Sequence, residues 1–560
     1  MEETLRLRVQ EALAAMDAAD VAFAIEWPAD LTHGDFATNA ALAAAKLLGR
    51  SPRDIADELA AKLTDSLGDL AASVTAAGPG FVNITLARSV ITEEIVRAGK
   101  ERDSWGAGLA RTGERVAFEY SCPNAFKEMH AGHLMNTIIG EALSRILESQ
   151  GAHVLRDTYG GDVGPHVAKA LWALRRKDVT EPSSAEEIGQ AYAEGSRAYE
   201  ESEDAKKEID DLNARLYAVL AQGDGAHTEA DRALLATWRT GRDVSFAAFR
   251  ALWDMLGTRF DYIIHESETT PIGKEKVLEA LEKGIFAESQ GAVIYDGEKK
   301  GLHTLVFLTS RGNPTYEAKD VGLAFLKEER MGPLDASYIT TASEQTGHFS
   351  VFLAALEDIA PALAKKTSHI THGFLKLTTG KMASRKGNVL TAGELIRDIT
   401  AKAAEKNEDL LVASAVAIGA IKYMILRQAP GGDIIFDPEK ALSLDGDSGP
   451  YLQYALVRAK SIIALSEKEA AASETPTEAY DIERLIIRFP EVVRRAEAFK
   501  APHHITQYLT QLASEWNSFY GNNRIRGAEF EEYKLTLALA FVTTMQNGLT
   551  LLGIPVPEKM

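Results

Sequence analysis

The stretch from residue 115 to residue 158 constrains this fold most, because it alternates strand, helix and strand. Val116 to Tyr120 is a short apolar run, Leu134 to Gln150 has helical periodicity, and Ala152 to Thr158 is again strand-like. This order predicts a βαβ unit with two parallel strands. A His-Ala-Gly-His tetrad at residues 130–133 lies just where the helix is expected to begin.

A tetrad in this position is suited to binding a triphosphate. The first turn of a helix presents unpaired backbone N–H groups and the positive end of the helix dipole. Gly132 lets a nucleotide approach the backbone closely, and His130 and His133 can donate hydrogen bonds as an α-phosphorus becomes five-coordinate. Taken alone, the tetrad is equally well interpreted as one helix-capping histidine and one on a polar face.

A second cationic motif, TGKMASRKG at residues 379–387, lies far downstream. Its Lys381, Arg385 and Lys386 lie on a glycine-bounded loop that is able to close on a pyrophosphate leaving group. Thr391 and Glu394 then form a capping box that opens a helix. Alone, the loop is better interpreted as a solvated basic turn.

The flanking regions predict two further domains, since 560 residues exceed the size of a single core. Residues 1–112 combine a helical start with β-rich runs around a Gly-Pro-Gly turn at 78–80, which predicts a small α+β domain containing a hairpin. Residues 401–560 are dominated by helical periodicity and predict an all-helical domain.

Residues 113–400 predict an α/β domain with a parallel, Rossmann-type sheet. Its further strands are expected at 305–308, 338–341 and 369–377. A charged, helical stretch from about 165 to 260 interrupts this domain and indicates a solvated insertion.

Composition excludes several classes of protein. With 46% hydrophobic and 25% charged residues, the chain is typical of a soluble globular protein. Cys122 is the single cysteine, which excludes an internal disulfide and a multi-cysteine zinc site and favours a reducing, cytoplasmic location. We expect neither a targeting signal nor a membrane span. A formal net charge of -20 argues against indiscriminate coating of nucleic acid, although it leaves room for a local basic groove.

The residues around both motifs resemble the arginyl-tRNA synthetase family of class I aminoacyl-tRNA synthetases. The similar segments span almost the whole chain: THGDFATN (32–39), EYSCPNAFKEMHAGH (119–133), NPTYEAKD (313–320), KMASRKG (381–387), GPYLQYALVR (449–458) and WNSFYGNNR (516–524). The resemblance implies a Rossmann-type catalytic domain with a helical insertion, an N-terminal tRNA-contacting domain and a helical anticodon-binding domain. It also implies ATP-dependent ligation of arginine to tRNA(Arg), with tRNA bound before arginine is activated.

The family's site residues carry over position by position. Catalytic roles fall on His130, His133, Lys127 and Lys381. ATP binding falls on His130, Gly132, His133, Lys127, Lys381, Ser384 and Arg385. Arginine binding falls on Glu119, Asn124, Tyr316, Asp320 and Gln345. Contacts to tRNA fall on Asn39, Tyr451, Gln453, Arg458, Trp516 and Asn517.

The arginine-binding set makes chemical sense for a guanidinium, which offers five donors in a fixed plane. Glu119 and Asp320 supply negative charge, and Tyr316 covers the planar group or bonds to it. Asn124 and Gln345 suit the α-amino or carboxylate end. Each residue also has an ordinary structural interpretation, as a surface ion pair or as core packing.

The resemblance implies Mg²⁺ as a cofactor that arrives with ATP and is held mainly by phosphates and water, with no metal site built from the protein. The expected partners are arginine, ATP and tRNA(Arg), with no membrane, and a monomer is expected.

The sequence departs from the family pattern in four places. Cys122 replaces a serine, Glu128-Met129 replaces Pro-Phe, and Lys319 replaces an arginine. The segment GDVGPH (161–166) lacks the usual tryptophan and glutamine. These departures indicate a divergent member, and they affect the expected tRNA acceptor path more than ATP binding.

Three alternatives stay open from the sequence. A noncatalytic RNA-binding paralogue would keep the scaffold, although the intact tetrad and Lys381 loop argue against it. A synthetase for another amino acid is disfavoured by Glu119 and Asp320, which favour a cationic substrate. A small-molecule adenylyltransferase would not need the long helical C-terminus.

Overall fold

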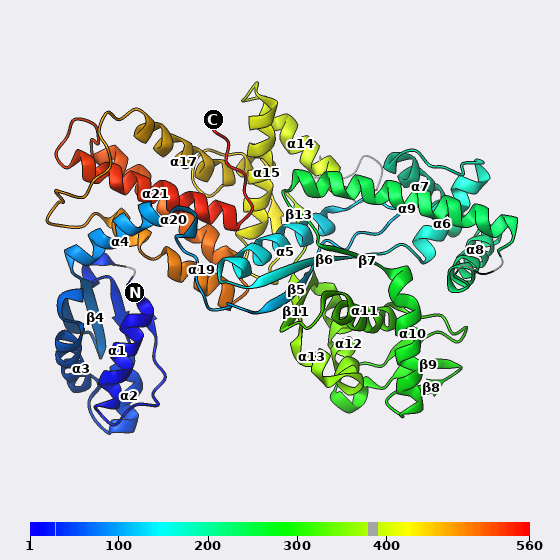
Figure 1. Ribbon diagram of the computed structural model, residues 1–560, viewed down its shortest axis with the longest axis horizontal. Coiled ribbons are helices and arrows are strands. Elements are labelled where there is room, and N and C mark those ends of the chain that lie inside the picture. Colours follow the sequence, from blue (N-terminus) through cyan, green and yellow to red (C-terminus); the bar gives the residue numbers. More distant parts are fainter. Residues whose placement is uncertain (29, 224, 226, 379–389) are drawn as a thin grey trace. The chain divides into compact units, whose positions relative to one another are not determined.

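The computed structural model describes residues 1–28, 30–223, 225, 227–378 and 390–560 (Figure 1). These residues form two compact units. The first unit comprises residues 1–107, 451–495 and 507–548. The second comprises residues 108–450, 496–506 and 549–560. The domain boundaries expected near residues 112 and 400 stay a prediction.

The first unit contains a four-stranded antiparallel sheet in the order β1-β2-β4-β3. Its strands are β1 (Ile25–Glu26), β2 (Phe36–Thr38), β3 (Ala71–Ala77) and β4 (Phe81–Leu86). The turn between β3 and β4 contains Gly78 and Gly80, both at positive φ, where a side chain would be strained. The predicted hairpin around this turn is confirmed.

Helices complete the first unit. Those near the sheet are α1 (Glu2–Ala14), α2 (Ala40–Leu48), α3 (Pro52–Leu67) and α4 (Arg88–Glu101). The later ones are α17 (Gly449–Ala464), α18 (Asp481–Ile486), α19 (Phe489–Ala498), α20 (His503–Asn522) and α21 (Glu531–Leu551). The short segments 449–450, 496–506 and 549–560 at the ends of these helices belong to the second unit.

The second unit is built on a five-stranded parallel sheet in the order β12-β11-β5-β6-β7. Its strands are β5 (Arg115–Glu119), β6 (His153–Gly160), β7 (Tyr262–His265), β11 (Ala336–Ala342) and β12 (Thr367–His372). The central strand β5 is buried throughout most of its length, as expected for a parallel sheet covered on both faces. The predicted βαβ unit is therefore confirmed, with α5 (Ala131–Ser149) as its crossover helix.

Helix α5 packs on the sheet through apolar side chains at helical spacing. Leu143 and Leu147 join Val116, Phe118 and Tyr120 in one buried cluster. The contact is close, because a Cβ on residue 140 would come within 2.2 Å of the Tyr120 ring. Only glycine at position 140 permits this approach, and it fixes the helix that begins with the tetrad.

The predicted helical insertion consists of four helices between β6 and β7: α6 (Pro165–Arg176), α7 (Ala185–Glu201), α8 (Glu203–Ala221) and α9 (Glu229–Met255). Side-chain caps define several of their ends. The hydroxyls of Ser184, Ser202 and Thr228 each accept a backbone N–H at the start of a helix.

One predicted strand lies in a different sheet. Residues 305–308 form β10 (Leu305–Leu308), which pairs antiparallel with β9 (Ala292–Tyr295), and β9 pairs with β8 (Ala287–Ser289). The expectation that this strand joins the parallel sheet is wrong. The small sheet contributes Tyr295 and Phe307 to an aromatic cluster with Phe286.

The remaining helices of the second unit lie between the later strands of the parallel sheet or after its last strand in the sequence. They are α10 (Glu266–Glu282), α11 (Tyr316–Met331), α12 (Thr346–Ile359), α13 (Pro361–Lys366), α14 (Ala392–Ala404), α15 (Leu410–Leu426) and α16 (Pro438–Ala441). The stretch predicted as one strand at 369–377 divides into β12 and β13 (Leu375–Leu377), and β13 pairs with β14 (Ile434–Phe436). Among the described residues, no helix has the length and apolar character needed to cross a membrane.

A buried lysine ties three segments of the second unit together. Lys422 on α15 is 2% exposed, and its Nζ donates to the carbonyls of Leu256 (2.6 Å) and Gly553 (2.5 Å). Arg145 of α5 also donates to carbonyls of the connection after α9 and of the C-terminal segment, at 2.8 and 3.0 Å. Burial, with the nearby Arg145 charge, lowers the pKa of Lys422 to about 7. A neutral amine has two N–H donors, which matches the two carbonyls.

We expect Lys422→Met to lower the melting temperature, because two buried carbonyls lose their donor at a cost of about 1–3 kcal/mol each. Since the pKa of Lys422 is about 7 when folded and 10.5 when unfolded, the unfolded chain binds the extra proton between these values. Wild-type stability relative to the variant should therefore rise from pH 7 to pH 9.5 in thermal melts. Lys402→Met, an exposed lysine on α14, is the control. Parallel pH dependence in wild type and Lys422→Met would contradict this assignment.

Candidate active site

The tetrad forms the N-terminus of α5, as predicted. His130 is the N-cap, and its Nδ1 accepts the backbone N–H groups of Gly132 (3.1 Å) and His133 (3.4 Å). In return, Nδ1 of His133 accepts the backbone N–H of His130 at 3.2 Å. The two imidazoles stack with their centroids 3.7 Å apart. This reciprocal capping box holds both rings rigidly at the mouth of the helix.

Both imidazoles are neutral at physiological pH. Burial, reinforced by the charge of Lys127, lowers the pKa of His130 to about 4. Burial, then His130 and Lys127, lowers the pKa of His133 well below its usual value. Because each Nδ1 accepts a hydrogen bond, the hydrogen-bond network assigns the ring proton to Nε2 in both residues. The tetrad thus carries two Nε2–H donors that bring no net charge.

Lys127 supplies the positive charge beside the tetrad. It is half-buried, and its Nζ lies 5.4 Å from the centre of the Tyr192 ring of α7. Its influence on the pKa of both tetrad histidines shows that it lies within electrostatic range of them. The structure therefore brings together three of the residues expected to bind ATP.

The chain that follows the downstream motif returns to the tetrad. The backbone N–H of Ala131 donates to the carbonyl of Leu390 (3.2 Å), and that of Ala392 donates to Met129 (2.8 Å). The predicted capping box of Thr391 and Glu394 begins α14 at this point. Lys381, Ser384 and Arg385 lie outside the described residues, so their contribution to ATP binding stays a prediction.

The loop from β5 to the tetrad has an unusual backbone. Ser121, Cys122 and Phe126 all have positive φ, at 72°, 47° and 62°. Hydrogen bonds from α9 hold this conformation: Trp253 Nε1 donates to Ser121 Oγ (2.9 Å), and Ser245 Oγ accepts the N–H of Phe126 (3.0 Å). Backbone strain of this kind persists only where the surroundings impose it, and it is frequent at functional sites.

Asn124 lies in the same loop, against the 161–166 segment. The N–H of Gly161 donates to Pro123 (3.1 Å) and the N–H of Ala125 donates to Gly161 (2.8 Å), which aligns the two segments in parallel. A Cβ on Gly161 would meet Asn124 Oδ1 at 2.3 Å. The amide of Asn124 is therefore held above the carboxyl ends of β5 and β6.

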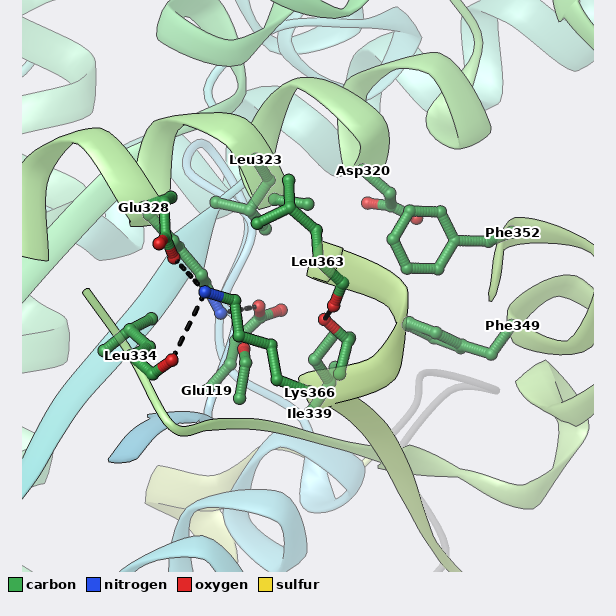
Figure 2. Close-up of a pocket in the computed structure, with 14 residues that line it drawn as sticks. Glu119, Asp320, Leu323, Glu328, Leu334, Ile339, Phe349, Phe352, Leu363 and Lys366 are labelled. Atoms are coloured by element: carbon green, nitrogen blue, oxygen red, sulfur yellow. Dashed lines mark hydrogen bonds and ion pairs between the residues drawn. The ribbon is translucent and has the colours of Figure 1, made fainter. Parts of the chain in front are cut away.

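Glu119, at the end of β5, is 4% exposed and already has a partner. Its Oε2 accepts a hydrogen bond from Lys327 Nζ of α11 at 2.5 Å, and the same Nζ lies 2.7 Å from Asp157 on the adjacent strand β6. Burial outweighs the attraction of Lys327 and raises the pKa of Asp157 to about 7. Glu119 and Asp320 line the same pocket, and the aromatic rings of Phe349 and Phe352 form part of its wall (Figure 2).

Asp320 on α11 is paired with a histidine that sequence reasoning missed. His348 Nε2 lies 2.7 Å from Asp320, and its Nδ1 lies 3.3 Å from Glu317. The two carboxylates outweigh the effect of burial and raise the pKa of His348 to about 10, so the imidazolium is charged at neutral pH. The pKa of Asp320 is raised by its burial.

Sequence reasoning also missed a further buried carboxylate, Glu266. It directly follows β7, is 5% exposed, and pairs with Lys319 Nζ at 2.7 Å. Lys319 in turn lies 5.1 Å from the ring centre of Tyr316, which is 56% exposed at the start of α11. Gln345 is exposed in the turn before α12. The signal that could have identified Glu266 is its place at the carboxyl end of a parallel strand.

Negative charge exceeds positive charge in this cluster. Among the described residues, its carboxylates are Glu119, Asp157, Glu266, Glu317 and Asp320. Its resident cations are Lys319, Lys327 and His348. The five acids outnumber the three cations, and the excess of negative charge is reduced because burial raises the pKa of Asp157 to about 7 and also raises the pKa values of Glu266 and Asp320. The pocket is therefore suited to a cationic ligand.

Two residues predicted to contact tRNA lie in the core of the first unit. Trp516 and Gln453 are both 0% exposed. The indole of Trp516 stacks on Phe541 with centroids 4.4 Å apart. These two side chains pack between the helices in this structure and present no surface to a partner, so a direct contact of either with tRNA stays a prediction.

The other predicted tRNA contacts are accessible to different degrees. Arg458 is exposed, with its guanidinium 4.7 Å from the ring centre of Tyr520. Tyr451 is half-buried, and its hydroxyl accepts a hydrogen bond from Asn517 at 3.0 Å. Asn39 Oδ1 accepts the backbone N–H of Ala24 at 2.8 Å, which stabilises the turn before α2. Their RNA contacts stay predictions.

Comparison with known proteins identifies relatives over nearly the whole chain. Residues 102–437 match the catalytic domain of tRNA synthetases class I (R), residues 452–560 match the DALR anticodon binding domain, and residues 3–86 match the arginyl tRNA synthetase N-terminal domain. The arginine–tRNA ligase of Clostridium perfringens is 30% identical, with 96% of each chain covered. That of Porphyromonas gingivalis is 29% identical over 92% of each chain. The arginyl-tRNA synthetase of Thermus thermophilus superimposes with a TM-score of 0.78 at 27% identity, covering 100% of both chains.

We expect Cys122 to react slowly with alkylating reagents. Burial, with the adjacent Glu119, raises the pKa of its thiol well above the usual range, and the thiolate is the reactive form. At pH 8, iodoacetamide should modify the folded protein at least about ten times more slowly than it modifies the urea-unfolded chain, and mass spectrometry follows both rates. Cys122→Ser should abolish the labelling. Equal rates in both states would show that the loop does not shield the thiol.

Proposed function

The chain belongs to the arginyl-tRNA synthetase family of class I synthetases, and we propose that it ligates arginine to tRNA(Arg) at the expense of ATP. In the first step, the arginine carboxylate attacks the α-phosphorus of ATP, which forms arginyl-adenylate and releases pyrophosphate. In the second step, the 2′-hydroxyl of the terminal tRNA ribose attacks the acyl carbon, and AMP leaves.

The observation that carries this proposal is the excess negative charge at the carboxyl edge of the parallel sheet, where the loop to the tetrad begins. Arginine brings a guanidinium and an α-ammonium, against one carboxylate, and its net positive charge suits a site in which acids outnumber cations. The guanidinium fork binds carboxylates in fixed, bidentate geometry. Glu119, Asp320 and Tyr316 act as arginine ligands, with Asn124 and Gln345 at the α-amino and carboxylate end.

The tetrad stabilises the phosphates in the activation step. The Nε2–H groups of His130 and His133, with the N-terminus of α5, donate to the phosphate oxygens as charge develops on them. Because both Nδ1 atoms already accept backbone N–H groups, each neutral imidazole presents its Nε2–H to the phosphates as a hydrogen-bond donor. Lys127 adds positive charge, and Lys381 neutralises the departing pyrophosphate, together with Ser384 and Arg385.

Magnesium enters this scheme with the nucleotide. The tetrad offers N–H donors rather than carboxylate oxygens, so its residues fit the phosphates of a nucleotide whose Mg²⁺ is held by phosphate and water. When bound, the ion shields the negative charge of the triphosphate.

Recognition of tRNA is assigned to the terminal regions. Arg458, Tyr451 and Asn517 lie on α17 and α20 and offer a cation, an aromatic ring and an amide, which suit unstacked bases. Asn39 lies at the start of α2 in the N-terminal region. We further propose that the enzyme is a cytoplasmic monomer and that tRNA binds before arginine is activated.

The decisive experiment is ATP–pyrophosphate exchange, measured with each amino acid in turn and with and without tRNA(Arg). We expect exchange with arginine alone among the amino acids, and only in the presence of tRNA. Exchange that depends on a different amino acid would overturn the specificity, and complete absence of exchange would favour a noncatalytic RNA-binding paralogue.

Replacing a phosphate donor tests the mechanism. His133→Ala should lower the exchange rate about a hundredfold, because a preorganised donor to the transition state is lost. Its Kd for tRNA, measured by filter binding, should stay within about twofold of wild type, since the tetrad is assigned to ATP rather than to tRNA binding. His153→Ala, an exposed histidine at the start of β6, is the control. Equal losses of exchange and tRNA binding in His133→Ala would contradict the assigned role.

A further inference from the structure

Lys319 is enclosed by groups from three different elements. It is 4% exposed, and its Nζ lies 2.7 Å from Glu266 Oε2. The same Nζ lies 5.1 Å from the ring centre of Tyr316 and 5.6 Å from that of Tyr217. A buried ammonium between a carboxylate and two aromatic rings is held by both the ion pair and the cation–π attraction.

Tyr217 belongs to α8 and so brings the helical insertion to this cluster. Its hydroxyl lies 3.9 Å from the position that a Cβ on Gly164 would occupy, next to the segment that follows β6. Burial raises the pKa of Tyr217, which is consistent with a phenol shielded from water. The charge pattern of the insertion predicts a solvated appendage, whereas this contact places one of its side chains beside the carboxylate cluster.

The two carboxylate oxygens of Glu266 have different neighbours. Lys319 binds Oε2, and Oε1 lies 3.4 Å from the position of a Cβ on Gly161. Asn124 Oδ1 lies 2.3 Å from that same position. With Oε2 fixed, Oε1 therefore lies on the side of Asn124, within the loop expected to bind the amino acid.

We infer that Lys319 and Tyr217 are positioning residues of the amino-acid site: they hold Glu266 so that its Oε1 faces the bound substrate, and the insertion thereby takes part in arginine binding. The inference rests on the proposed function. Neither residue needs to touch arginine. Loss of the ammonium leaves a buried carboxylate without its counter-ion, and loss of the Tyr217 ring leaves the ammonium with Glu266 and Tyr316 alone.

The insertion provides a matched control. Tyr199 of α7 also lies near two ammonium groups, 4.5 Å from Lys169 Nζ and 5.9 Å from Lys206 Nζ. Its hydroxyl bonds to Asp210 rather than to any member of the carboxylate cluster. Tyr199→Ala therefore removes a similar aromatic–cation contact in the insertion without altering the surroundings of Glu266.

The test is steady-state ATP–pyrophosphate exchange in the presence of tRNA(Arg), with KM for arginine and KM for ATP measured separately. Lys319→Met should raise KM for arginine about tenfold and KM for ATP less than about threefold, because only the amino-acid end is disturbed. Lys319→Arg keeps the charge and should stay within about threefold of wild type. Tyr217→Ala should raise KM for arginine about fivefold, and Tyr217→Phe, which keeps the ring but loses the hydroxyl that bonds to Lys319, by less, about two- to threefold. Tyr199→Ala should stay within about twofold.

The wild-type assay separates the two claims. Absence of arginine-dependent exchange in the wild type would overturn the proposed function itself. If the wild type is active but Lys319→Met and Tyr217→Ala leave KM for arginine unchanged, the positioning role is wrong and the function stands. Equal rises in both KM values, or equal effects of Tyr217→Ala and Tyr199→Ala, would also overturn it. Because Tyr217 is only half-buried, its variants keep the test valid if Lys319→Met fails to fold.

Discussion

Partial neutralisation of buried carboxylates is the constraint on which this active site depends. An isolated buried carboxylate would protonate, and a fully neutralised one would not attract a cationic substrate. Lys327, Lys319 and His348 each pair with at least one acid at the carboxyl edge of the parallel sheet, and together they leave a small negative excess. The resident cations oppose the rise in carboxyl pKa that burial causes, and the remaining excess of acids makes the cluster attractive to a cation.

The helical insertion is part of this construction. Ser245 and Trp253 of α9 hold the strained loop that carries Asn124 into place, and Tyr217 of α8 packs against Lys319. Parallel strands end at one edge of the sheet, and the insertion joins two of them, β6 and β7. Its first end therefore leaves the sheet at the edge where the site lies, and α9 leads the chain back toward the start of β7 at the opposite edge. An insertion at this point of the chain is well placed to support the pocket.

Sequence patterns predicted the features that depend on neighbouring residues, and they failed to predict pairings between residues that are far apart in the chain. Periodicity and capping chemistry identified the βαβ unit, the tetrad at the start of α5 and the capping box at Thr391. The strand at 305–308 was assigned to the wrong sheet, because a short β-rich run does not specify its partner. Lys327 pairs with Glu119 across 208 positions, and no spacing rule reveals such a contact. Trp516 shows the converse limit, since helical spacing does not distinguish an aromatic residue that fills the core, as this one does, from one that contacts RNA.

The acidic composition is less opposed to RNA binding than the formal charge of -20 suggests. A substantial part of the negative charge is buried or paired. Glu483 is 0% exposed beside Arg88, Glu2 pairs with Arg495, and the carboxylates of the amino-acid pocket are enclosed. Buried, paired charges project little field to a partner outside, whereas exposed cations such as Arg458 act on it directly. The formal charge therefore includes acids that are enclosed within the protein, and the electrostatics of tRNA binding depend on the groups that remain exposed.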